Sequence, residues 1–361
     1  MEVEGRFGKG PHIEQSASSK NFRAFQMSWV HTIAKAILAV AATSPLFAQA
    51  WLFPKGEGTV TVSYQHSYLP LHVMSKGETS DIGPIHLYGI LMDVDYSLTS
   101  KLAARISLPY SAGKYEGPSP HKLPIDDGTY HGTLQDFRTD IRYSLRRRPL
   151  VLTPFFQLVT PSHAYEHYAH STIGLRLREY RVGANFGRRL DPVLPNAFFQ
   201  VRYAYVVAQS VNGLSANNAD LLRFAVLHLP ESQPPDSFRP RRSDTEFQVG
   251  YFLTPRLTLF ALGSWFHPHN GIDYVAGVFP NNLTQGQLFN HDRIARLSLV
   301  DLGGGASIAL TKSMDVFAAA LTNVRARNGH KLAASVTVGV SRHFRTPWAG
   351  IPETSTPGAS Q

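Results

Sequence analysis

Polar and apolar side chains alternate along many ten-residue stretches of this chain, and the clearest stretch is 136–145, DFRTDIRYSL. One face of this stretch carries Asp136, Arg138, Asp140, Arg142 and Ser144. The other face carries Phe137, Thr139, Ile141, Tyr143 and Leu145. Successive side chains of a β-strand point to opposite faces of its sheet. The stretch therefore predicts a strand with one charged face and one apolar face.

The same alternation recurs in the stretches 59–68, 101–110, 246–253 and 331–344. In each of them one face is mostly small or polar, and the other is mostly aliphatic or aromatic. A soluble sheet would bury the apolar face against a second layer, whereas a barrel in lipid turns that face outward and lines its lumen with polar groups. Hydrophobic residues make up 43% of the 361 residues and charged residues 17%, which fits alternating strands and not a disordered chain.

The spacing of the turns favours the barrel. Short connectors lie near 98–101, 146–149, 191–196, 254–256 and 311–313. Longer polar segments alternate with them near 70–83, 113–130, 161–170, 210–242 and 269–291. Short periplasmic turns with long external loops are the layout of outer-membrane barrels. We therefore expect an all-β fold, an antiparallel up-and-down transmembrane β-barrel.

The number of strands follows from the same pattern. We expect about twelve, at 58–69, 85–97, 101–112, 132–145, 150–160, 171–190, 196–209, 243–254, 256–268, 292–310, 314–326 and 331–344. Both termini then lie in the periplasm. The apolar segment Asp220–Leu229 does not fit, because one extra strand would break the even parity. We assign it to the outer loop 210–242 as a plug or a lid hairpin, with a fourteen-strand barrel that splits this loop as the alternative.

The N-terminal region carries an export signal. Residues 27–50 read MSWVHTIAKAILAVAATSPLFAQA, with a positive charge at Lys35 and an apolar stretch of the length of a signal-peptide core. That stretch is too short to span a bilayer. The A-x-A sequence at 48–50 predicts cleavage after Ala50, and Met27 is a possible true start.

These observations divide the chain into three parts. Residues 1–50 are an N-terminal extension and a cleaved signal peptide, 51–344 the barrel, and 345–361 a disordered periplasmic tail. The last predicted strand ends at Phe344, and a terminal aromatic residue resembles the signal for outer-membrane assembly. We expect the outer membrane of a Gram-negative-type bacterium as the location, with outer-membrane lipid and the barrel assembly machinery as partners.

Two short motifs carry a family resemblance. The segment GTLQD at 132–136, followed by DIRY at 140–143, resembles the G-x-D … L-x-Y hairpin of the outer-membrane barrels named for the meta-pathway of phenol degradation. PFFQL at 154–158 and TPS at 160–162 are similar to the P-F … P-T-G strand and loop of that family, without its loop glycine. The resemblance implies an outer-membrane barrel that takes up aromatic or hydrophobic small molecules.

Charged side chains on the inward faces are the candidate functional residues. The lumen-lining selectivity candidates are Asp93, Asp95, Arg105, Asp136, Arg138, Asp140, Arg142, Arg202, Glu246 and Gln248. Such residues act as an electrostatic filter for solutes in a channel. The alternative is a structural network of salt bridges that fills a small barrel.

Other motifs point away from cofactors, nucleic acid and catalysis. The loop histidines His163, His167 and His170 form H-x3-H-x2-H, which suits a metal, but spacing in a loop does not bring side chains together, so we expect no metal site and no cofactor. The glycines at 303–305 predict a bulge or bend of a strand. The net charge of +9 is scattered along the chain, so we expect no nucleic-acid partner. No catalytic motif is recognisable, and we predict that the protein is not an enzyme.

We expect the barrel to serve passive passage of a small-molecule solute, hydrophobic or aromatic in character. One alternative is a structural or surface-interaction barrel without transport. The other is an outer-membrane lipid-modifying enzyme, which needs a Ser–His pair near the lipid-facing rim. His66 faces outward in the predicted register, but no serine partner can be named for it.

Overall fold

The structure is a computed structural model, and it describes residues 50–347 except 82, 118–124, 169, 172, 217–235 and 279–282. The predicted signal peptide before Ala50, the segment Asp220–Leu229 and the tail after 347 lie outside the described residues. No helix among the described residues is long and apolar enough to cross a membrane.

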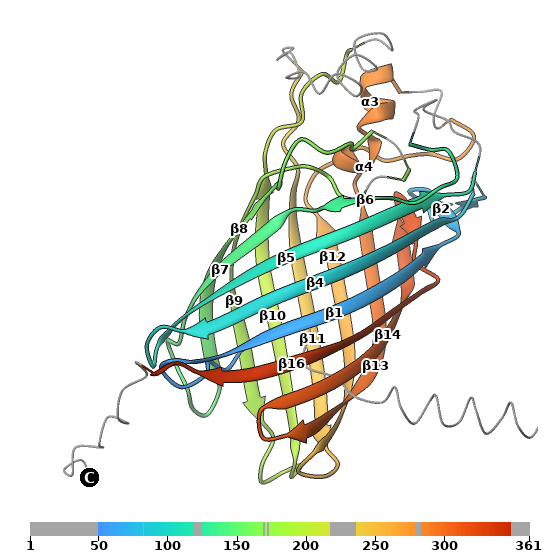
Figure 1. The fold of residues 1–361 in the computed structure, drawn as a ribbon. Coiled ribbons are helices and arrows are strands. Elements are labelled where there is room, and N and C mark those ends of the chain that lie inside the picture. The colour runs from blue at the N-terminus through green and yellow to red at the C-terminus, as the bar shows by residue number, and fades with distance from the viewer. Residues whose placement is uncertain are drawn as a thin grey trace, which may run out of the picture. The chain divides into compact units, whose positions relative to one another are not determined.

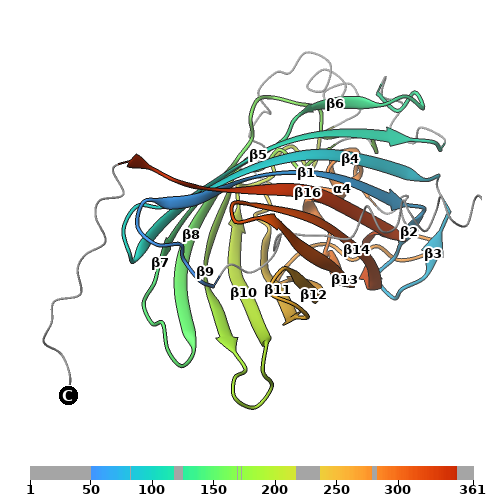
Figure 2. The same ribbon diagram turned by 60° about the horizontal axis from the view of Figure 1, so that its bottom comes forward.

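Twelve antiparallel strands of the described chain form a closed barrel (Figure 1). They are β1 (Glu57–Leu69), β4 (Ile85–Ser97), β5 (Leu102–Tyr115), β7 (Phe137–Tyr143), β8 (Val151–Thr160), β9 (Glu179–Arg189), β10 (Ala197–Ala208), β11 (Arg241–Phe252), β12 (Leu257–Pro268), β13 (Ser298–Thr311), β14 (Met314–Arg327) and β16 (Ala334–Arg345). Each strand pairs with its neighbours in sequence order, and β1 pairs with β16 to close the ring, as Figure 2 shows. The predicted all-β barrel and its twelve strands are confirmed.

Three predicted strands differ from the observed ones. The strand expected at 171–190 begins only at Glu179, and the one expected at 292–310 begins at Ser298. The strand expected at 132–145 is split into β6 (His131–Leu134) and β7. Between the pairs Tyr110↔Leu134 and Ser107↔Arg138, two residues of β5 lie opposite three of the neighbouring segment. One of those two is Pro109, which has no backbone N–H to donate, so the ladder is interrupted there.

The polarity of the barrel wall is inverted relative to a soluble protein. On β7, Asp140 is 1% exposed and its apolar neighbour Ile141 is 51% exposed. On β1, Ser63 is buried while Val62 is 47% exposed. Soluble proteins bury such aliphatic residues and expose such polar ones. The outward surface is therefore a lipid-facing surface and the inward one a polar lumen.

Gly303, Gly304 and Gly305 do not form the predicted bulge. Their pairing with both neighbouring strands is continuous, and the irregularities of β13 lie at Val300/Asp301 and at Ala309/Thr311. A Cβ on Gly305 would lie 2.9 Å from the ring of Phe260 on the opposite strand. The glycine therefore makes room for an inward aromatic ring.

The two ends of the barrel differ. One end carries the short turns, and the outer-membrane layout assigns it to the periplasm. At the other end the long loops fold together with β2 (Leu71–Val73), β3 (Thr79–Ser80), β15 (Gly329–Lys331), α3 (Gln285–Phe289) and α4 (His291–Ile294). We call the described residues of the segments 71–80, 163–178, 209–216, 269–296 and 328–331 the outer cap.

The outer cap has an apolar core of its own. Its buried residues are Leu177, Ala208, Val211, Leu214 and Ile294. Val211 and Leu214 belong to the described part of the loop 210–242, which was predicted to be a plug or a lid. That part is joined in the cap by residues of the loops after β8 and β12, so the cap is built from several loops.

Candidate functional site in the barrel lumen

Two unlike walls face each other across the lumen. Inward positions on β4, β5, β7, β10 and β11 carry the predicted selectivity residues, while Asp136 lies in the bulge before β7 and accepts a 2.5 Å hydrogen bond from Tyr165 of the outer cap. Inward positions on β12–β14 and β16 are mostly small or apolar. They include Phe260, Leu262, Gly303, Gly305, Phe317, Ala319, Leu321 and Gly339.

The central part of the charged wall is a linked set of ion pairs. Arg105 grips the Asp93 carboxylate with both Nε (3.0 Å) and Nη2 (2.9 Å). Arg142 pairs with Asp95 two strands away and lies 3.2 Å from Asp140. These side chains are largely buried, and a buried charge requires such partners. The predicted ladder is therefore brought together by the fold.

Arg202 extends this set across the barrel wall. It rises from β10, and its Nη2 lies 2.8 Å from Oδ2 of Asp140 on β7. Its guanidinium carbon lies 3.6 Å from the centre of the ring of Phe155 on β8, which is a cation–π contact. Because β8 and β9 separate the two strands, this side chain covers part of the lumen wall and narrows the passage.

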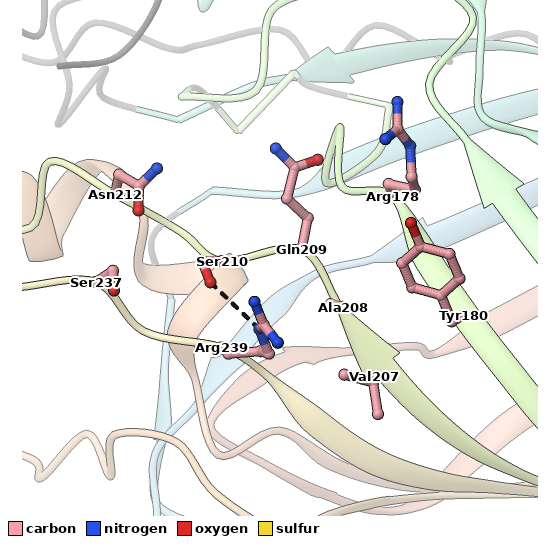
Figure 3. A pocket seen from close by; sticks show the side chains of 9 residues that line it. All are labelled: Arg178, Tyr180, Val207, Ala208, Gln209, Ser210, Asn212, Ser237 and Arg239. Atoms are coloured by element: carbon pink, nitrogen blue, oxygen red, sulfur yellow. Dashed lines mark hydrogen bonds between the residues drawn. The ribbon is translucent and has the colours of Figure 1, made fainter. Parts of the chain in front are cut away.

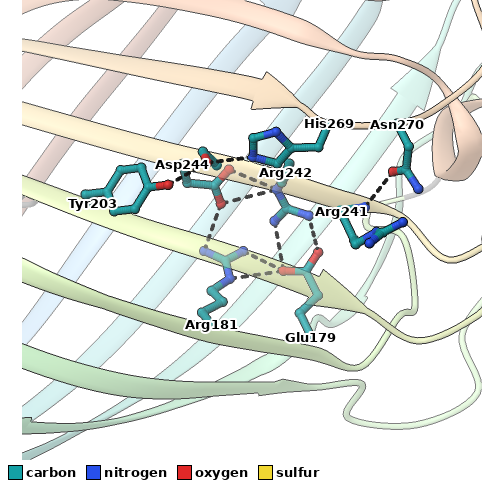
Figure 4. A network of polar contacts seen from close by, with 9 residues as sticks. Glu179, Arg181, Tyr203, Arg241, Arg242, Asp244, His269 and Asn270 are labelled. Atoms are coloured by element: carbon teal, nitrogen blue, oxygen red, sulfur yellow. Dashed lines mark hydrogen bonds and ion pairs between the residues drawn. The ribbon is translucent and has the colours of Figure 1, made fainter.

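A second set of ion pairs lies toward the outer cap (Figure 4). Glu179 lies between Arg242, at 2.7 Å, and Arg181, at 2.6 Å. Asp244 pairs with Arg242 at 2.9 Å and with Arg181 at 3.5 Å. The two carboxylates and two guanidinium groups neutralise each other and link β9 to β11 across the inner face of β10. Glu179 and Arg181 were not among the selectivity candidates because the alternation slips at the start of β9. Arg242 and Asp244 were not named either: Arg242 lies before the strand predicted at 243–254 and Asp244 at its start.

Four predicted residues stay outside these ion pairs. Asp136 accepts its hydrogen bond from Tyr165, and Gln248 accepts one of 3.2 Å from Gln200. Glu246 faces Arg202 directly across strands, yet it forms no ion pair with the described residues. The Nε of Arg138 is buried without a hydrogen-bond partner among them. The lumen thus combines paired charges with Arg138 and Glu246, which form no ion pair within the described part of the chain.

The start of the described chain enters the short-turn end of the lumen. The backbone N–H of Ala50 donates to Gln200 Oε1 at 2.8 Å, and Thr153 Oγ1 donates to the Ala50 carbonyl at 2.7 Å. Trp51 packs edge-on against Phe198, with ring centres 6.2 Å apart, beside a cavity of about 520 Å³. No local sequence pattern predicts these contacts, because they join residues more than 100 positions apart.

A Ser–His pair lies near the outer rim of the wall. Ser243 Oγ and His269 Nε2 are 2.8 Å apart, and Tyr203 places its hydroxyl 2.9 Å from the same Oγ (Figure 4). No carboxylate and no side-chain amide of the described residues contacts His269, although a triad uses such a third group to orient the imidazole. The outward His66 instead stacks on Tyr88 at 4.5 Å.

A basic groove borders this rim where β9 begins and β10 ends (Figure 3). It has a volume of about 430 Å³ and carries Arg178 and Arg239 at its edges. Both arginines are exposed to solvent, and Arg239 donates to Ser210 Oγ at 3.3 Å. The groove lies outside the lumen and opens to the surface.

The histidine motif of the outer loop does not converge on itself. His163 contacts Thr133 and Ser162, and His167 contacts Arg293. His170 alone lies beside other histidines, which come from distant parts of the chain.

Comparison with known proteins supports the fold. No family model and no curated protein matches this chain, so the resemblance to the phenol meta-pathway family stays a prediction. An outer membrane channel from Pseudomonas putida F1 superposes with a TM-score of 0.59 over 84% of this chain and 100% of that chain, at 13% sequence identity.

Two further structures score lower. The translocator domain of the autotransporter NalP from Neisseria meningitidis has a TM-score of 0.45 at 13% identity, over 90% of this chain and 96% of that chain. The NanC porin has a TM-score of 0.44 at 10% identity, over 78% of this chain and 98% of that chain. At these values only the Pseudomonas channel bears on the fold. The closed barrel and its lipid-facing surface place the protein in the bacterial outer membrane.

Proposed function

We propose that this barrel passes small molecules with an apolar or aromatic body and a polar group across the outer membrane by diffusion. The observation that carries this proposal is the pairing of two unlike walls in one lumen. A charged wall alone would suit ions or sugars, and an apolar wall alone would bind a hydrophobic solute without releasing it.

The apolar wall offers contact to the body of such a solute. Phe260 and Leu262 form an apolar cluster with Ala319, and Leu321 packs against it. Burial of apolar surface is worth about 25 cal/mol per Å². Phe260 lines the cavity beside Trp51, so a ring in that cavity gains binding free energy by covering apolar surface while the opposite wall keeps its polar group satisfied.

The charged wall offers two groups to the polar end. Arg138 and Glu246 are the candidates, since the neighbouring charges are already engaged with one another. A solute that replaces water around a buried, incompletely bonded arginine recovers hydrogen bonds that the protein does not supply. Selectivity would then come from these two groups more than from the paired ladder.

Passage through this lumen requires a movement at each end. The outer cap closes the long-loop end, and Trp51, packed against Phe198, narrows the short-turn end. We therefore expect conductance in discrete openings and not as a constant leak.

Proteoliposomes test the proposal. Swelling rates are compared in isotonic solutions of a small aromatic carboxylate and of a sugar acid of the same charge, and single openings are recorded in planar bilayers. The expected result is several-fold faster swelling with the aromatic acid. Equal rates would remove the apolar preference, and a barrel that is folded on gels but silent in both assays would leave the surface-interaction alternative.

One observation favours the enzyme alternative enough to test it, namely the 2.8 Å contact between Ser243 and His269. We propose that the pair is not catalytic, because neither a carboxylate nor a side-chain amide of the described residues orients the histidine. Purified barrel and Ser243→Ala should then release equal amounts of fatty acid from phospholipid micelles. A loss of hydrolysis in the variant would make the protein a lipid-modifying enzyme.

A further inference from the structure

Four histidines from four different loops meet inside the outer cap. His72 lies on β2, His330 on β15, and His291 is the first residue of α4. His170 lies in the loop before β9, with its ring 5.9 Å from that of His291 and 5.7 Å from that of His330. His72, His291 and His330 each bring one ring nitrogen to within 4.8 Å of the others, which is a spacing that one metal ion can bridge.

The sheet fixes two of these side chains relative to each other. His72 and His330 are directly opposite in the antiparallel pair of β2 and β15. Residues in such a pair project from the same face with their Cβ atoms about 4.5–5.5 Å apart. Their ring centres are 5.0 Å apart and their planes nearly perpendicular, at 89°. The two imidazoles are thus held by backbone pairing and not by flexible loops.

The third histidine is oriented by its own surroundings. Nδ1 of His291 lies 2.7 Å from the carbonyl oxygen of Leu288, and a carbonyl can only accept, so Nδ1 carries the proton. Nε2 then presents its lone pair. Tyr274 is fully buried and donates its hydroxyl to the His291 carbonyl at 2.5 Å, which holds the backbone in place. A second ring nitrogen bonded to a backbone carbonyl is the usual arrangement of a metal-binding histidine.

A carboxylate completes the set of donors. Oδ1 of Asp292 lies 3.4 Å from Nε2 of His291 and 3.8 Å from Nε2 of His330. Ligands bonded at about 2.0–2.1 Å in a tetrahedron around zinc are separated by about 3.3 Å. The distances from Asp292 Oδ1 to the two histidine nitrogens are therefore close to the ligand–ligand distance of a tetrahedral zinc site.

We propose that His72, His291 and His330 bind a zinc-class divalent metal ion in the outer cap, with Asp292 as the fourth ligand. Imidazole and carboxylate donors in a tetrahedral arrangement suit zinc. The ligands come from the loops after β1, β12 and β14, so the ion ties three loops together above the small and apolar wall of the lumen. This inference does not depend on the proposed transport, since the site is in the cap.

Metal titration of the purified, folded barrel tests the site. The protein is treated with a chelator and then titrated with Zn²⁺, and separately with Co²⁺, whose visible absorption is intense only in a tetrahedral site. We expect one equivalent of Zn²⁺ per barrel and a tetrahedral Co²⁺ spectrum. The double variant His72→Gln/His330→Gln should bind Zn²⁺ at least about 100-fold more weakly, because even changes around the ligands cost 10- to 100-fold.

Two further variants keep the test decisive. His163→Ala, in a neighbouring loop but outside the cluster, should bind Zn²⁺ as the unchanged protein does. Asp292→Asn alters a 38% exposed side chain and should leave the barrel folded, as judged by its heat-modifiable band on gels. The same variant should lower the affinity for Zn²⁺ about tenfold. Absence of Zn²⁺ binding to the unchanged barrel, or undiminished binding in both the double variant and Asp292→Asn, would overturn the proposal.

Discussion

Arg202 forms its ion pair with Asp140 and not with Glu246, its neighbour on the adjacent strand. Its direct cross-strand neighbour on β11 is Glu246, yet its guanidinium lies 2.8 Å from Asp140 on β7. The ring of Phe155 lies under the guanidinium and supports this path. The side chain therefore crosses the inner faces of two strands and leaves Glu246 open to the lumen.

Arg202→Ala should widen the passage. Removal of the guanidinium uncovers the inner faces of β8 and β9, so single-channel conductance and solute swelling rates should both increase. Asp140 keeps Arg142 at 3.2 Å, so the loss of stability should be about 1–3 kcal/mol, below the 3–5 kcal/mol of a fully orphaned buried charge. Urea unfolding in lipid vesicles measures it.

A second variant tests whether Arg202 affects conductance by covering the lumen wall or by its positive charge alone. Arg188 is exposed on the outward face of β9, so Arg188→Ala removes the same charge without touching the lumen. Conductance should be unchanged in this variant. An equal increase in both variants would show that Arg202 acts through net charge and not by covering the wall.

Sequence alternation predicted the wall of the barrel but not the connections across it. The inward positions of Asp93, Asp140 and Arg142 follow from period two alone, which is a local property of a strand. The choice of Asp140 by Arg202 depends on rotamers and on the curvature of the closed barrel, which no local pattern encodes.

The contacts within the outer cap were even less predictable from local sequence patterns. Its loops have no hydrophobic period, and the strands expected to begin at 171 and 292 were extended too far into them. His72 and His330 are 258 positions apart in sequence and became neighbours only through the pairing of β2 with β15. The loop motif around His163 was visible in the sequence, yet the cluster takes only His170 from it.

Gly187→Ala should loosen the short-turn end. A Cβ at this position would lie 3.0 Å from the ring of Trp51, which is tighter than almost all real Cβ contacts, so the Trp51 ring has to shift. We expect more frequent openings in planar bilayers. Gly89→Ala is the control, since its Cβ would lie 3.6 Å from Ser111, an ordinary contact. Identical opening frequencies in the two variants would mean that Trp51 does not restrict passage.

Ala319→Asp should abolish the preference for an aromatic solute. Ala319 is 6% exposed and belongs to the apolar cluster with Phe260 and Leu262, so a carboxylate there places a charge on the wall that would receive a ring. Swelling in the aromatic acid should fall to the rate in the sugar acid. Ala319→Val has a similar volume and no charge, and it should keep the preference. If both variants lose it equally, width and not polarity sets selectivity.

Val62→Arg tests the lipid-facing assignment directly. Val62 is 47% exposed near the middle of β1, between Met92 and Val340 of the adjacent strands. A charge at the bilayer midplane on the outside of a barrel costs about 2–4 kcal/mol of folding free energy. Val62→Ala, which keeps the site apolar, should cost much less. Reversible urea unfolding in vesicles measures both, and equal stabilities of the two variants would mean that this face does not contact hydrocarbon.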